Sequence, residues 1–181
     1  PELDVITRSA VVKNIGNHLL YITKVYSAAM DFLNGEFDIL HFHGRHAMER
    51  MEERVPVIFG NQSFGSRRGT SSHQQNPFFI LADTETTEDY GSCYGMSMLY
   101  SGNFKLEVEK DQIGQTRMEM GLLDEMLEYS LEQGKEFYTP EVAMAYSQNG
   151  LTSLSHLYHK LIRYHVCRGK YKTSRRPILI N

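Results

Sequence analysis

The sequence predicts a mainly β protein, an antiparallel β-sandwich with one C-terminal α-helix. Apolar residues recur at every second position, as in Phe104-Lys-Leu106-Glu-Val108-Glu, which is the pattern of strands with one buried face. Turn-forming residues separate such stretches at regular intervals, which is typical of a sandwich and not of a βαβ fold. Near the end of the chain the apolar period changes to three and four residues, which indicates a helix.

The strands are predicted from alternation and from the turns that bound them. In chain order they cover residues 5–12, 19–29, 37–43, 55–59, 77–82, 96–100, 104–109, 118–120 and 142–146. Glycine-centred turns lie between several of them, at Gly16, Gly91, Gly102 and Gly134. Asn34-Gly35 is the best candidate for a two-residue hairpin turn.

The predicted helix covers residues 149–169, with Asn149 as its cap and Gly169 at its end. Its apolar face is formed by Leu151, Leu154, Leu157, Tyr158, Leu161, Ile162 and Val166. The basic run 170–176 is predicted to be a linker, and 177–181 the first buried strand of a further domain. The alternative for this last stretch is a strand added to the sandwich edge. The expected division is therefore a sandwich over 1–148, a helix over 149–169, and a linker with the start of another domain over 170–181.

Composition excludes several classes of function. The 181 residues are 41% hydrophobic and 23% charged, which fits a globular core. A net charge of −3 gives no electrostatic reason to expect nucleic-acid binding. No apolar run approaches the ~20 residues of a membrane helix, so no membrane partner is expected. Two cysteines, Cys93 and Cys167, are too few for a disulfide framework, which predicts a reduced compartment and a cytoplasmic location, although one bridge stays compatible.

The N-terminus, Pro-Glu-Leu-Asp-Val, lacks an initiator Met and the basic and apolar stretches of a signal peptide. We therefore expect the chain to be a piece of a larger protein.

No metal or cofactor site is predicted. His41 and His43 share a face of a strand and His46 lies nearby, but no Cys or spaced carboxylate completes a zinc pattern. His156 and His159, with His165 beyond them, are expected to serve helix packing or capping. Neither a P-loop nor a dinucleotide-binding glycine motif occurs.

Nucleophiles and carboxylates give no catalytic group. Cys93 lies in an alternating strand and is expected to be buried and inert, whereas the reactivity of Cys167 stays open. The carboxylates form charge runs, which are usually solvated faces, and no catalytic pair can be chosen among Glu49, Glu52, Glu53, Asp83, Glu85, Glu88 and Asp89.

The segment 66–79 is the most unusual part of the sequence. It runs Ser66-Arg-Arg-Gly69-Thr-Ser-Ser-His73-Gln-Gln-Asn76-Pro77-Phe78-Phe79 and combines polar side chains with aromatic rings, the groups that a sugar pocket uses. The alternative is a structural loop whose side chains fix its own backbone.

At this segment the sequence resembles bacterial α-galactosidases of glycoside hydrolase family 36. The similar motifs are Ser66-Arg-Arg-Gly69, Ser72-His73-Gln74 and Asn76-Pro77-Phe78, then Tyr94-Gly95, Tyr100-Ser-Gly-Asn-Phe104, Glu107-Val108-Glu109, Pro140-Glu141-Val142, Tyr146-Ser147, His159-Lys-Leu161-Ile-Arg163 and Arg176-Pro-Ile-Leu-Ile-Asn181. The resemblance spans roughly residues 44–181. The sequence departs from many relatives after Gly44, where His46 and Met48 stand in place of an aromatic residue and an arginine.

The resemblance implies a three-part parent, with an N-terminal β-supersandwich like that of galactose mutarotase, a catalytic (β/α)₈ barrel and a small C-terminal sheet domain. It implies a retaining α-galactosidase acting on oligosaccharides such as melibiose and raffinose, whose two catalytic carboxylates lie beyond Asn181. This chain would therefore be inactive alone. Its expected partners are its own barrel, galactosides bound through that barrel, and further copies in a homo-oligomer.

By the same resemblance, His73, Gln74 and Gln75 are expected to be outer sugar contacts at the mouth of the barrel. Two other classes remain open: a stand-alone lectin-like sandwich, and a purely structural or oligomerisation domain.

Overall fold

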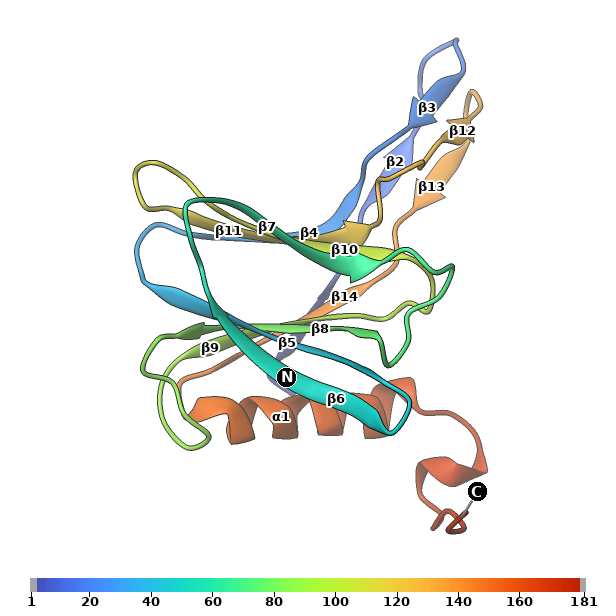
Figure 1. Ribbon diagram of the computed structural model, residues 1–181. Helices are drawn as coiled ribbons and strands as arrows, with labels where there is room; N and C mark the ends of the chain where they lie inside the picture. Colours follow the sequence, from blue (N-terminus) through green and yellow to red (C-terminus); the bar gives the residue numbers. More distant parts are fainter. Residues whose placement is uncertain (1–2, 180–181) are drawn as a thin grey trace.

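The computed structural model describes residues 3–179 and has two layers of antiparallel strands with a helix against one of them (Figure 1). The larger sheet has the strand order β1-β14-β9-β8-β5-β6. Its strands are β1 (Val5–Arg8), β5 (Phe37–Arg45), β6 (Met48–Pro56), β8 (Gln75–Asp83), β9 (Cys93–Met98) and β14 (Val142–Ser147). The predicted sandwich with one C-terminal helix is confirmed.

The second layer is a three-stranded sheet with the order β10-β11-β4. It consists of β4 (Tyr26–Phe32), β10 (Phe104–Lys110) and β11 (Thr116–Leu122), and β7 (Gly60–Ser66) runs beside β10 (Figure 1). The β10–β11 pair forms a regular ladder from Phe104↔Leu122 to Lys110↔Thr116. Alternating residues of these strands therefore point between the layers, as the sequence predicts.

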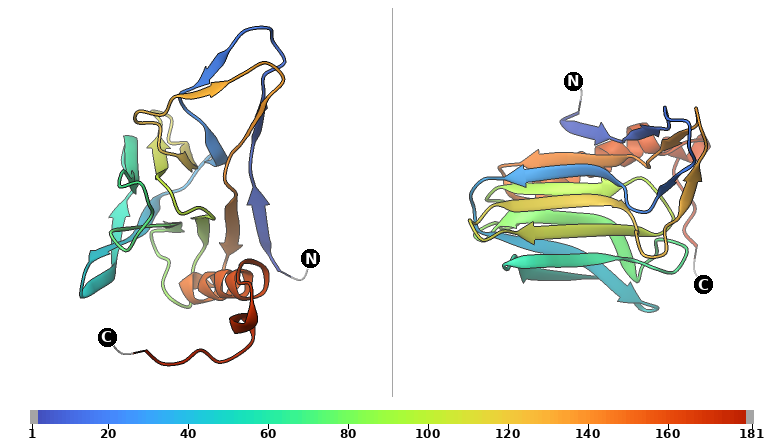
Figure 2. Two further views of the ribbon diagram at one scale, coloured as in Figure 1. Left: turned by 90° about the vertical axis from the view of Figure 1, so that its right-hand side faces the viewer. Right: turned by 90° about the horizontal axis from the view of Figure 1, so that it is seen from above.

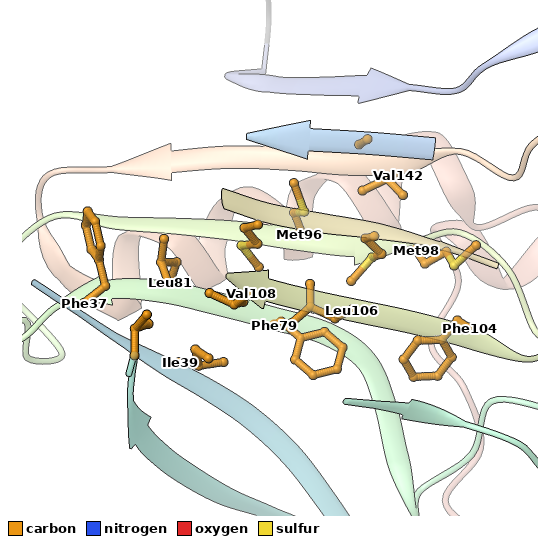
Figure 3. Packing of buried hydrophobic residues seen from close by; sticks show 14 residues of the cluster. Phe37, Ile39, Phe79, Leu81, Met96, Met98, Phe104, Leu106, Val108 and Val142 are labelled. Carbon is orange, nitrogen blue, oxygen red and sulfur yellow. The ribbon is translucent and has the colours of Figure 1, made fainter. Parts of the chain in front are cut away.

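The space between the layers holds the main core (Figure 3). Phe79 and Leu81 from the larger sheet meet Phe104, Leu106 and other apolar side chains from the smaller one, all fully buried. The core is rich in methionine, whose flexible side chain fills irregular gaps.

Helix α1 (Gly150–Leu161) covers the outer face of the larger sheet and builds a second core (Figure 2). Leu154, Tyr158 and Leu161 are buried there, and the hydroxyl of Tyr158 donates to the carbonyl of Ala143 at 3.1 Å. Because this sheet is covered on both faces, β14 buries neighbouring residues such as Val142 and Ala143 on opposite sides.

An arm projects from one end of the sandwich (Figures 1 and 2). We use this name for β2 (Val11–Lys13), β3 (Leu20–Ile22), β12 (Tyr129–Leu131) and β13 (Glu136–Tyr138), which pair as β12-β3 and β13-β2. Buried Asn14 fastens the arm, since its side-chain amide donates to the carbonyls of His18 and Leu131, both at 2.8 Å.

Several predicted strand boundaries are wrong. The ranges 5–12 and 19–29 each divide into two strands, because the chain leaves the sandwich for the arm and returns. Of the predicted range 55–59, residues 55–56 are the end of β6 and residues 57–59 form the connection between β6 and β7. Asn34-Gly35 is not a hairpin turn, since β4 and β5 belong to different sheets and the turn carries the chain between them.

The C-terminal prediction also needs correction. The α-helix ends at Leu161, a π-helix follows over Ile162–Val166 and a 3₁₀-helix over Lys170–Lys172. Asn149 occupies the cap position without a side-chain hydrogen bond. Residues 177–179 form no strand, and residues 180–181 lie outside the described part. The division into 1–148, 149–169 and 170–181 stays a prediction.

Candidate functional site

The segment predicted to bind sugar is the connection from β7 to β8, and it lies beside the tip of the β5–β6 hairpin. An open groove separates the two, lined by Glu49, Arg50, Ser71, Ser72, His73, Asn76 and Pro77. We call it the His73 groove. Arg50 enters it from β6 with a backbone φ of 58°, which is uncommon for a residue other than glycine.

The connection is fastened to the neighbouring loop between β9 and β10. The backbone amide of Gly69 donates to the side-chain oxygen of Asn103 at 2.6 Å, and that of Ser71 donates to the carbonyl of Ser101 at 2.8 Å. Ser66 closes the turn by donating its hydroxyl to the carbonyl of Thr70 at 2.7 Å. Part of this polar segment therefore fixes its own backbone, as the structural alternative predicts.

The three predicted contact residues lie together but differ in their surroundings. His73 is exposed on the groove, and Gln74 is half-buried with its backbone amide donating to the hydroxyl of Ser72 at 3.2 Å. Gln75 begins β8, and its side-chain amide donates to the carbonyl of Phe42 at 3.2 Å. Gln75 therefore ties the loop to β5, whereas His73 is free to meet a ligand.

Two further groups in the His73 groove are relevant to binding. The side-chain oxygen of Asn76 is buried and accepts no hydrogen bond within the described residues. A buried acceptor without a donor is costly, so it marks a place that a partner could satisfy. The second is Arg50, which the sequence does not single out because it does not reveal that the hairpin tip faces the loop.

The strand histidines form a separate cluster. The Nε2 atoms of His41 and His43 lie 3.5 and 3.3 Å from one carboxylate oxygen of Glu53, while His46 is exposed at the hairpin tip. Burial lowers the pKa of His41, and its Nδ1 atom has no hydrogen-bond partner among residues 3–179. Residues 3–179 contain no group of three or more His, Cys, Asp or Glu placed to hold a metal ion.

The carboxylates between β8 and β9 belong to a structural loop. Arg54 donates to the carboxylate of Asp38 at 2.6 Å and to the carbonyls of Asp83, Thr84 and Thr86 at 2.7–3.0 Å. This arginine holds the loop against the β5–β6 hairpin. These hydrogen bonds fix the backbone of the loop, and among its carboxylates that of Glu88 accepts a hydrogen bond from the Thr152 hydroxyl at 3.3 Å.

Neither cysteine forms a disulfide, and the helical histidines are exposed. Burial raises the pKa of the Cys93 thiol to about 11, so it is protonated at neutral pH and inert, as predicted. The rings of His156 and His159 lie 6.3 Å apart on the outer side of α1, and His165 is exposed on the π-helix that follows. All three are exposed, so the predicted role in helix packing is wrong, and the alternative role in capping stays a prediction. No helix among residues 3–179 is long and apolar enough to span a bilayer.

Comparison with known proteins gives two family matches. The model described as the glycosyl hydrolase family 36 N-terminal domain matches residues 1–132, and the melibiase model matches residues 136–181. The change from one to the other falls at the arm, before β14 and α1.

Characterised relatives match almost the whole chain. It is 56% identical to the bifunctional alpha-galactosidase/sucrose kinase AgaSK of Mediterraneibacter gnavus and 43% identical to alpha-galactosidase AgaA of Geobacillus stearothermophilus, over 99% and 98% of its length. It spans only 19% and 24% of those proteins.

Solved structures have the same fold. The galactosidase domain of AgaSK superimposes with a TM-score of 0.94 at 55% identity, covering 97% of this chain and 24% of that one. AgaA in complex with stachyose superimposes with a TM-score of 0.95 at 42% identity, covering 98% of this chain and 25% of that one.

Proposed function

The chain belongs to glycosyl hydrolase family 36 as its N-terminal domain, and from this premise we propose that it is the non-catalytic sandwich of an α-galactosidase. The observation that carries the proposal is the match of the entire fold, arm and helix included, to the N-terminal part of α-galactosidases.

The parent enzyme would remove terminal α-D-galactosyl residues from oligosaccharides such as melibiose and raffinose. A retaining mechanism needs a carboxylate nucleophile and a carboxylic acid facing each other across the glycosidic bond. We assign both to the part of the parent beyond Asn181. The carboxylates whose contacts are described above serve ion pairs and loop structure, which supports an inactive isolated domain.

We assign the His73 groove to the outer part of the substrate site. His73 and Gln74 would contact sugar hydroxyls at the mouth of the barrel, and Gln75 would hold the loop in place through Phe42. The buried, unpartnered oxygen of Asn76 supports a ligand or partner at this position. Variants of AgaA have been crystallised with stachyose and with raffinose, which are galactosides of the expected class.

We further propose that the parent is a cytoplasmic homo-oligomer. The two free thiols support a reducing compartment. The projecting arm, with exposed apolar side chains such as Tyr21 and Tyr138, supports association with further copies.

The first test is to assay the isolated chain and the parent side by side on p-nitrophenyl α-galactoside. We expect an active parent and an inert chain. Activity in the isolated chain would place a catalytic carboxylate pair within it. An inert parent that still binds galactose would favour the lectin-like alternative.

The second test concerns the groove and uses raffinose hydrolysis by the parent. His73→Ala and Gln74→Ala should each raise KM roughly 2- to 10-fold with kcat retained, which is what loss of one hydrogen bond to bound sugar produces. His156→Ala and Gln112→Ala are matched controls, exposed and away from the groove. Unchanged kinetics in the groove variants would mean that this domain has a purely structural role and does not contact the sugar.

A further inference from the structure

The chain carries its charges in two blocks of opposite sign. Residues 1–141 contain all 22 acidic residues and 12 of the 19 basic ones. Residues 142–181 contain the other seven basic residues, three histidines and no acid. The small net charge of −3 therefore hides an acidic sandwich joined to a basic C-terminal segment.

Within the basic segment, the chain folds back after α1 and encloses a groove. Its lining includes Arg163, Cys167, Tyr171, Lys172, Arg175 and Arg176. We call this the basic groove. The segment that lines it follows the C-terminal end of α1 and lies beyond the helix, away from the two sheets (Figure 2). The buried side of α1 covers the second core.

Local contacts hold the basic groove in shape. The ammonium of Lys172 donates to the carbonyl of Tyr164 at 2.6 Å. The cations of Lys170 and Arg176 lie 4.8 and 5.6 Å from the ring centre of Tyr171. These cations are therefore organised without a carboxylate.

Across residues 3–179, none of the seven cations of this segment forms an ion pair. An acidic loop lies at the opposite end of the helix, where Thr152 donates its hydroxyl to Glu88 at 3.3 Å. The N-terminal end of α1 is thus acidic and its C-terminal end basic, the arrangement that the helix dipole favours.

We propose that the basic groove docks an acidic surface of the melibiase domain of the same polypeptide. This proposal rests on the proposed function, in which a melibiase domain follows this sandwich. Arg163 and Arg175 would pair with carboxylates of that domain and fix the angle between the two domains.

Three observations identify this occupant. The basic segment lies in the part matched by the melibiase model, and the acidic sandwich almost entirely in the part matched by the N-terminal domain model. The relatives are in total about four to five times as long as this chain, so in them a large domain is available to cover the groove. Burying unpaired cations in a domain interface is costly, so the surface that covers them has to supply acids.

The test compares the same charge reversal in two proteins. Arg163→Glu with Arg175→Glu is introduced into the isolated chain and into the parent, and thermal unfolding of the sandwich is followed in 50 mM and 500 mM NaCl. In the isolated chain the change relieves repulsion between like charges, so Tm should stay or rise slightly. In the parent it should lower Tm by about 4 °C or more at low salt and by less at high salt.

Arg8→Glu is the matched control, an exposed arginine on β1 without an ion pair in residues 3–179. It should leave Tm nearly unchanged in both proteins. Arg163→Gln with Arg175→Gln repeats the test if the reversed variant of the parent fails to fold, and should lower the parent's Tm by a smaller amount.

An equal change of Tm in the isolated chain and the parent would overturn the proposal. So would association of the isolated chain at 50 mM NaCl that disappears at 500 mM and in the reversed variant, because the acidic partner would then be a second copy. Galactosidase activity is measured separately. If the parent were inactive but the charge reversal still lowered its Tm and not that of the isolated chain, the proposed activity would be refuted and the docking proposal would stand.

Discussion

His41 lies where burial and a neighbouring carboxylate act in opposite directions. Burial among the strands lowers its pKa below the ordinary 6.5, Glu53 favours the charged form, and His43 disfavours it. Its ring packs 4.5 Å from that of Phe64, so the neutral form suits the site. In the unfolded chain the imidazole is in water, so protonation carries no cost of burial.

The consequence for stability has a definite sign. Between the lowered pKa of the folded state and 6.5, the unfolded chain binds more protons at this position, so stability falls as the pH drops below 6.5. We expect the loss of stability between pH 7 and pH 5 to be smaller in His41→Gln than in the wild type, as measured by urea unfolding. The control is His46→Gln, which changes an exposed histidine and should lose as much stability between pH 7 and pH 5 as the wild type. An equal loss in the wild type, His41→Gln and His46→Gln would refute this role of His41.

Gly95 of β9 lies close under the ring of Tyr158 on α1. A methyl group there would lie 2.7 Å from a ring carbon of Tyr158. That ring is held by its hydrogen bond to Ala143 and packs 4.8 Å from Phe78, edge to face. The ring therefore has little freedom to move away.

Gly95→Ala should destabilise the domain by about 1–3 kcal/mol, because added volume in a tight contact forces strain. The measurement is the free energy of unfolding in urea. Gly16→Ala is the control, since its methyl group would meet only the Asn14 side-chain oxygen at 3.4 Å, and it should change stability by less than about 0.5 kcal/mol. A neutral Gly95→Ala would mean that α1 shifts freely on the sheet.

At the scale of elements, α1 belongs to the sandwich and not only to the connection that follows. Leu154 is fully buried in the core between the helix and the larger sheet. Leu154→Ala should therefore cost about 2–5 kcal/mol of unfolding free energy. His156→Ala, two residues away on the exposed side, should be neutral. If both were neutral, the helix would dock only when the melibiase domain is present.

Elements with an apolar alternation could be predicted from the sequence, and those without it could not. β10 and β11 alternate buried and more open residues along most of their length and lie as predicted. β6 was missed because nearly all its residues are exposed, and pairing with β5 makes it a strand. The arm was missed because its ladders join residues far apart in sequence, such as Val12 and Phe137.

The sequence predicted which segment carries the candidate site, but not which residues of other strands complete it. The composition of segment 66–79 was enough to single out the connection that carries His73. The contribution of Arg50 depends on the β5–β6 hairpin reaching that connection, which only the fold brings about. The role of Gln75 as a tie to Phe42 likewise depends on the pairing of β5 with β8.

At the scale of the whole molecule, exposed apolar side chains include groups on the arm and on the C-terminal segment. On the arm, Ile15, Tyr21 and Tyr138 are more than half exposed, and on the C-terminal segment Ile178 and Leu179 are more than four-fifths exposed. Leu154 and Leu161 of α1 do not add to this open surface, because the larger sheet covers both. The arm is also thin, and two-stranded ladders are marginally stable without cover.

We therefore expect the isolated chain to self-associate through apolar surface, and light scattering over a range of concentrations measures this. Association should persist in 500 mM NaCl, since salt screens charges and does not weaken apolar contacts. Ile15→Ser with Tyr138→Ser should reduce it if the arm is the contact, whereas Ile113→Ser, on an equally exposed turn at the end of the β10–β11 hairpin, should not. A monomer at high concentration would contradict the prediction, and would mean that the arm is stable in water and needs no second copy to cover it.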